Sequence, residues 1–160
     1  MPTIVETFAT SLGDAEKGVL HASVAFALSV TAKADNVVDG KEQRAIAALT
    51  GVIRERFGEP FAAQPESFTE AMKAAAHPDW PQQPYVIKLL DVLKRMPAEA
   101  RAEYDKNLLD VAMQVAGASG GILGFGQKVS VEERYALRRL VGTLRLTVDH
   151  PEMKTALGYE

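Results

Sequence analysis

The sequence predicts an all-α fold, a single helical bundle of about seven helices that forms one domain over residues 1–160. Strand signals are nearly absent, because no long run of alternating Val, Ile or Thr lies between turn residues. Ala, Leu, Glu, Lys and Arg dominate instead, and apolar residues recur at spacings of three and four, as in amphipathic helices. A third observation, a helical pair that occurs twice in the chain, indicates a bundle built from two similar halves.

The N-terminal half is expected to contain four helices, over residues 3–10, 14–34, 41–57 and 65–76. The helix over 14–34 is apolar on more than one face, which is typical of a helix buried in a core. The helix over 41–57 carries one apolar stripe, formed by Ile46, Leu49, Ile53 and Phe57.

The C-terminal half is expected to contain helices over 83–95, 97–116, 131–144 and 151–158. The connector before them, "HPDWPQQPY", is stiffened by three prolines. We interpret Trp80 in this connector as an aromatic plug that covers one end of the core. The alternative is a binding rim that Trp80 forms with His77, Asp79 and Tyr85.

Two helices are predicted to be central, those over 14–34 and 97–116. Four of their residues are expected to be inaccessible to solvent: Val24, Leu28, Leu108 and Val115. The helix over 131–144 is expected to carry one apolar stripe, formed by Tyr135, Leu137, Leu140, Val141 and Leu144.

Several classes of function are not expected from the composition. The chain has no cysteine, which excludes disulfides and thiolate chemistry, and His21, His77 and His150 show no metal-ligand spacing. The net charge is −3 without a basic run, so nucleic acid is not the expected partner. The N-terminus lacks the pattern of a signal peptide, and the apolar segment 19–32 is shorter than the roughly 20 residues of a membrane span. We therefore expect a cytoplasmic protein that does not span a membrane.

The repeat compares "SVTAKADNVVDGKEQRAIAALTGVI" with "MQVAGASGGILGFGQKVSVEERYALRRLVGTL". In each copy an apolar helix ends in Ala-x-Ala, and a polar turn with an apolar anchor follows. Each copy then has a capping residue followed three positions later by glutamate, Asp39 with Glu42 and Ser130 with Glu133. This spacing is the signature of a capping box at a helix N-terminus.

This helical pair, "KADNVVDGKEQRAI" in the first copy and "AGASGGIL…VSVEERYALRRL" in the second, resembles the TerB family of tellurite-resistance proteins. A related domain lies at the start of a membrane-anchored DnaJ-type co-chaperone. The resemblance covers the whole chain in outline. It implies an all-helical fold, a role in resistance to tellurite or other chemical stress rather than an enzymatic activity, and a divalent-metal site made of acidic residues.

Carried over to this chain, the resemblance implies a metal site formed by Asp35, Glu42 and Glu133. Ser119 occupies the position of the fourth acidic residue, and the second copy holds an insertion, "GFGQKV". Calcium or magnesium is the cation that such oxygen ligands favour. The alternative is that Asp39 and Glu42 only cap a helix while Asp35 faces solvent.

The resulting expectation is a non-enzymatic interaction or sensing module with protein partners in a stress-response system. A homodimer is one arrangement that the sequence leaves open. The alternative is a small helical metal-dependent enzyme, or a ligand-binding protein, that uses the same acidic cluster. An enzyme needs a concave pocket with a titratable group of perturbed pKa, whereas an interaction module needs an exposed patch.

Overall fold

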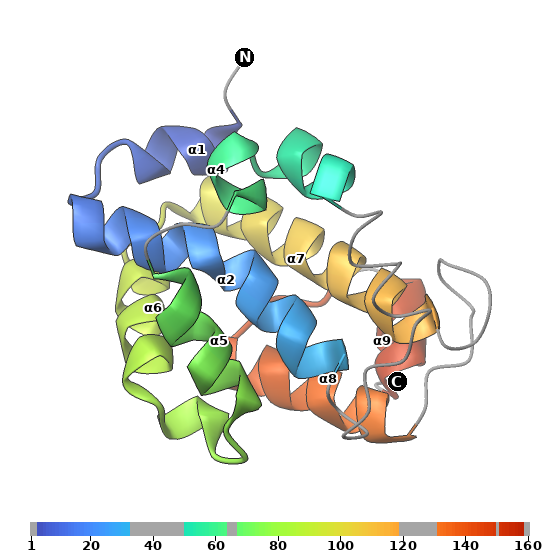
Figure 1. The fold of residues 1–160 in the computed structure, drawn as a ribbon. Helices are drawn as coiled ribbons and strands as arrows, with labels where there is room; N and C mark the ends of the chain where they lie inside the picture. The colour runs from blue at the N-terminus through green and yellow to red at the C-terminus, as the bar shows by residue number, and fades with distance from the viewer. Residues whose placement is uncertain (1–2, 33–49, 64–66, 119–130, 150, 159–160) are drawn as a thin grey trace.

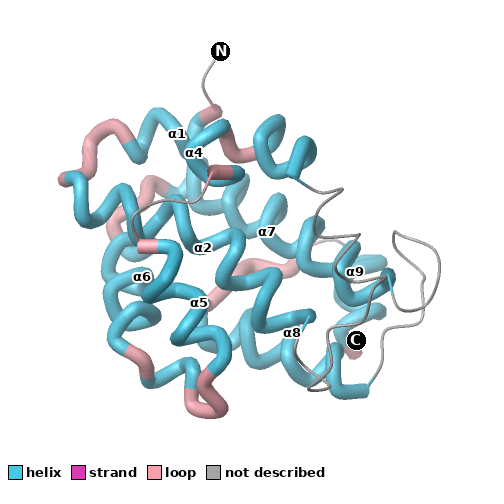
Figure 2. The backbone as a smooth tube through the Cα atoms, in the orientation of Figure 1, coloured by secondary structure: helices cyan, strands magenta, loops and turns pink. Residues whose placement is uncertain are grey.

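The computed structural model describes residues 3–32, 50–63, 67–118, 131–149 and 151–158. Within these ranges the secondary structure is entirely helical, as predicted, and Figure 2 shows only helices joined by loops. The elements are α1 (Ile4–Ala9), α2 (Asp14–Ala32), a helical segment over 50–56, α4 (Glu59–Ala62), α5 (Phe68–Ala76), the 3-10 helix η1 (Trp80–Gln82), α6 (Pro84–Lys94), α7 (Ala98–Ala118), α8 (Val131–Leu144) and α9 (Pro151–Leu157).

Helices α2 and α7 form the centre of the bundle, as the sequence predicts. They pack against each other, with α1 and α4 at one end, α5 and α6 along one side, and α8 and α9 at the other end (Figure 1). All four residues expected to be inaccessible are buried, which confirms the prediction: Val24, Leu28, Leu108 and Val115.

Polar links join the central helices to their neighbours inside the core. The Tyr104 hydroxyl on α7 donates to Ser23 Oγ on α2 over 2.8 Å, and Ser23 donates to the Leu20 carbonyl over 2.6 Å. The Tyr85 hydroxyl on α6 donates to the Val19 carbonyl over 2.7 Å. Because buried hydroxyls are costly without partners, these bonds set the register between the helices.

Trp80 is buried against the core, as expected of an aromatic residue that packs there rather than forming an open rim. Its ring meets the Phe26 ring of α2 edge to face, with the ring centroids 5.6 Å apart. The Arg139 guanidinium of α8 lies 5.2 Å from the centroid of the same ring and donates to the Pro78 carbonyl over 3.2 Å. Trp80 therefore fills the space between α2 and α8.

The predicted stripe of α8 was wrong in one residue. Tyr135 is exposed, and the buried face of the helix is formed by Glu133, Ala136, Leu137, Leu140, Val141 and Leu144. Tyr135 stands two positions before Leu137, which places the two side chains on opposite sides of a helix with 3.6 residues per turn. In the segment over 50–57, Ile53 and Phe57 are buried as predicted.

The internal repeat stays a prediction, because the two junctions that define it, 33–49 and 119–130, lie outside the described residues. Among the described helices, none combines the length and apolar character needed to cross a membrane.

Candidate functional site on helix α8

Of the three predicted metal residues, the structure describes one. Glu133 lies in the first turn of α8 and is 1% exposed, whereas Asp35 and Glu42 lie outside the described residues, as does Ser119. Within the described ranges no three or more His, Asp or Glu side chains are grouped to hold a metal ion. The site formed by Asp35, Glu42 and Glu133 therefore stays a prediction.

The depth of Glu133 distinguishes it from an ordinary capping glutamate. In α1, Glu6 forms a complete capping box with Thr3, and its side chain is only half-buried. Glu133 continues the apolar stripe of α8 one turn before Leu137, on the face that packs toward α2 and α7. A carboxylate at that depth is stable only when it is paired, hydrogen-bonded, protonated or bound to a cation. Glu133 is therefore a core-facing carboxylate, unlike the exposed Glu132 beside it.

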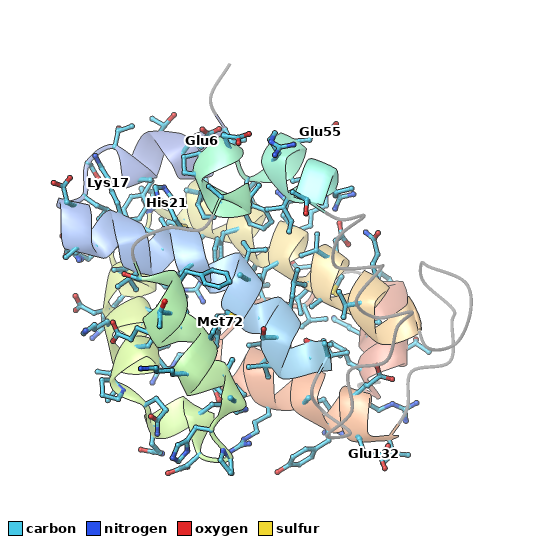
Figure 3. The ribbon with its side chains drawn as sticks, viewed as in Figure 1. Glu6, Lys17, His21, Glu55, Met72 and Glu132 are labelled. Atoms are coloured by element: carbon cyan, nitrogen blue, oxygen red, sulfur yellow. The ribbon has the colours of Figure 1, made fainter. Side chains whose placement is uncertain are left out.

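The outer face of the same helix is apolar and basic. Val131 is 76% exposed and Tyr135 is 68% exposed, the two highest values among the large hydrophobic side chains described. Together with three arginines they line a shallow hollow of about 680 Å³: Val131, Arg134, Tyr135, Arg138 and Arg139. We call this set the α8 face. Glu132, labelled in Figure 3, marks the start of the helix beside it.

Within its first turns, α8 thus has a buried carboxylate on one side and exposed apolar and basic side chains on the other. Glu133 is buried between Glu132 and Arg134, which are both exposed. Arg139 and Trp80 hold the middle of the helix against the core. Glu133 and the α8 face therefore lie on opposite sides of one short helix.

A second hollow, of about 460 Å³, lies where α1, α2 and α4 meet, and its lining includes Glu6, Lys17 and His21. These three side chains are labelled in Figure 3. The half-buried His21 ring meets the Phe61 ring edge to face at 4.9 Å. Burial and, second, the charge of Lys17 lower the pKa of His21, while Glu6 acts in the opposite direction. No local sequence pattern indicates this place, because its residues come from three separate segments.

Comparison of the chain with protein-family models, with curated proteins and with solved structures found no match.

Proposed function

We propose that this chain is a TerB-like, non-enzymatic interaction and sensing module that acts in the cytoplasm in response to tellurite or another chemical stress. The α8 face is its docking surface for a protein partner. The observation that supports this role is the arrangement of α8, with a buried carboxylate on one side and exposed Val131 and Tyr135 on the other.

The composition of the α8 face suits a protein partner. Tyr and Arg are among the residues enriched at protein interfaces, because each offers a large contact area together with polar groups. Exposed apolar side chains beside one another mark such surfaces more clearly than single ones do. Because the face is cationic, a partner with acidic residues around an apolar contact is favoured.

The sensing part of the proposal concerns a divalent cation held by Asp35, Glu42 and Glu133. The one described ligand fits, since a buried carboxylate is an oxygen donor of the type that calcium and magnesium prefer. A cation there would neutralise carboxylates that otherwise repel one another. Any resulting movement of α8 would change the surroundings of Trp80, the single tryptophan of the chain, because Arg139 lies over its ring.

Calorimetric titration with Ca²⁺ and Mg²⁺, combined with Trp80 fluorescence, tests this part. We expect heat of binding and a change in emission for the parent chain, tighter binding for Ser119→Asp, and loss of both signals for Glu133→Gln. Glu132→Gln is the matched control, because Glu132 is exposed and adjacent, and it should behave as the parent does. No heat with either ion, for the parent and for Ser119→Asp alike, would contradict cation sensing.

A second candidate, a binding protein for a small ligand, is favoured by the hollow at His21. Neither ring nitrogen of His21 makes a hydrogen bond to the described residues, and Lys17 forms no ion pair with them. Chemical-shift changes confined to Glu6, Lys17 and His21 on addition of small organic acids would favour this candidate. Their absence would leave the interaction module.

A further inference from the structure

A second surface of the chain is complementary to the α8 face. A groove of about 700 Å³ runs between the N-terminal half of α2 and the exposed side of α6, and Ser67 and Glu70 at the start of α5 also line it. Its apolar lining comes from Ala15, Val19, Ile87 and Val92. Ile87 is 58% exposed, so an apolar contact surface is open to solvent in the groove.

The rim of this groove is acidic. The carboxylates that line it belong to Asp14, Glu16, Glu70 and Asp91. Two cations offset part of their charge: Lys88 pairs with Glu70 over 3.0 Å, and Arg95 contacts both Glu16 and Asp91. Four carboxylates and two cations leave a net charge of −2. Asp14, at the start of α2, forms no ion pair with another described residue.

We propose that the groove binds the α8 face of a second copy of this chain. Tyr135 and Val131 would contact the apolar lining, and the exposed Arg134 between them would meet the carboxylates of the rim. A groove of this volume lies in the range that encloses drug-sized molecules, roughly 300–1,000 Å³, and so accommodates an aromatic side chain with its neighbours. Opposite charges around an apolar contact favour this pairing over face-to-face contact of two α8 faces, where arginines would meet arginines.

The two surfaces lie on different sides of the molecule. In Figure 1 the start of α2 and α6 lie at the left of the bundle, and the start of α8, which carries the α8 face, lies at its lower right. A contact between two different surfaces is heterologous, so each copy in such a pair keeps one surface free. The association therefore continues head to tail into short chains unless the rotation between copies closes a ring. This inference rests on the proposed function, because it uses the same face of α8.

Sedimentation velocity with two complementary variants tests the proposal. The first variant, Arg134→Glu with Tyr135→Ala, changes only the α8 face. The second, Asp91→Arg with Ile87→Ser, changes only the groove. All four positions are exposed, and circular dichroism verifies the fold of each variant. Lys106→Glu, a charge reversal at an exposed position of α7, is the matched control.

We expect the parent chain and Lys106→Glu to form a series of oligomers, with a dissociation constant on the order of 0.1 mM. Each double variant should associate at least about tenfold more weakly. A mixture of the two variants should form a one-to-one dimer and nothing larger, because only one intact pair of surfaces remains. Raising the salt concentration from 0.1 M to 1 M, which shortens the Debye length from about 10 Å to about 3 Å, should weaken all association.

Three outcomes would overturn the proposal: a parent chain that stays monomeric at 1 mM, a double variant that associates as the parent does, or a variant mixture without a dimer. None of them bears on docking of a different protein at the α8 face, which is measured separately by cross-linking from position 135. Failure of self-association is thereby distinguished from failure of the proposed function.

Discussion

The Arg101 guanidinium donates from Nε to Oδ1 of Asp105 over 2.7 Å, one turn along α7. The Asp105 carboxylate is 1% exposed, and its other oxygen accepts from the Thr147 backbone N–H over 2.8 Å. Arg101 also donates to the carbonyls of Leu144 and Arg145 at the end of α8. This pair therefore fastens the C-terminal end of α8, and the segment after it, to the central helix.

Replacing Asp105 with alanine is expected to lower the free energy of unfolding by about 3 kcal/mol. The change leaves the Thr147 N–H and the Arg101 guanidinium without their acceptor, and breaking a buried pair on one side is costly. Urea denaturation measures the loss, with Lys106→Ala, an exposed neighbour on α7, as the control. A loss below about 0.5 kcal/mol, the range of ordinary surface changes, would contradict the fastening role.

Replacing Arg145 with glycine is expected to raise the free energy of unfolding by about 1 kcal/mol. Arg145 ends α8 with φ of 55°, a left-handed conformation that costs energy in any residue with a Cβ, and the Leu146 N–H closes the turn on the Val141 carbonyl over 3.0 Å. The carbonyl that Arg101 uses is kept in the variant. Thermal denaturation measures the gain. Arg145→Lys, which keeps both the charge and the strain, should match the parent. An equal gain in both variants would show that removal of the arginine side chain, and not relief of backbone strain, is responsible.

Replacing Gly58 with alanine is expected to lower the free energy of unfolding by about 2–5 kcal/mol. Gly58 has φ of 120°, which alanine adopts only with strain, and an added Cβ would overlap the Glu6 side chain that caps α1. Gly51→Ala is the matched control, because Gly51 is helical with open space around it and the change should stabilise by about 1 kcal/mol.

The double variant Gly58→Ala with Glu6→Ala distinguishes the two possible causes of the lost stability, overlap with the Glu6 side chain and backbone strain. If Glu6 is the obstacle, the losses of Gly58→Ala and Glu6→Ala will not add, because the second change removes the overlap that the first creates. Additive losses in urea denaturation would assign the whole cost to backbone strain at Gly58.

The stability of the chain is expected to fall as the pH is lowered through the ordinary pKa of histidine, about 6.5. Burial and Lys17 lower the pKa of His21 in the folded chain. Just below pH 6.5 the unfolded chain therefore binds a proton that the folded chain does not, and stability declines until the pH reaches the lowered pKa. Above that window His21 is neutral in both states and has no effect.

Denaturant unfolding between pH 5 and 8, for the parent and for His21→Gln, measures this contribution. The difference in stability between the two should change across the window in favour of the variant as the pH falls. A constant difference would contradict a lowered pKa of His21.

Helix positions were largely predictable because periodicity and capping are local. The last long helix, predicted over 131–144, has those bounds in the structure, and Asp14 begins α2 as expected. Two local signals were missed: Thr3 with Glu6 has the spacing of a capping box, and Pro60 is a residue favoured in the first turn of a helix, here α4.

The surfaces could not be predicted in the same way, because they depend on contacts between distant segments. Arg101 meets residues more than forty positions away at the end of α8. The acidic groove exists only because α2 packs beside α6. The motif singled out Glu133, but the burial of its side chain follows from the packing of α8 against the central helices. The predicted apolar stripe of α8 placed Leu137 correctly on the buried face and Tyr135 wrongly on the same face.

Photo-cross-linking in cells tests most directly whether the α8 face docks a protein. A photoreactive amino acid replaces Tyr135 in one variant and the exposed Ala102 of α7 in another, and both are irradiated under tellurite stress. We expect a discrete adduct from position 135 with the mass of this chain plus one other protein, separate in mass from an adduct of two copies of this chain, and none from position 102. Absence of a discrete adduct at position 135, or the same adducts from both positions, would contradict the proposed docking surface.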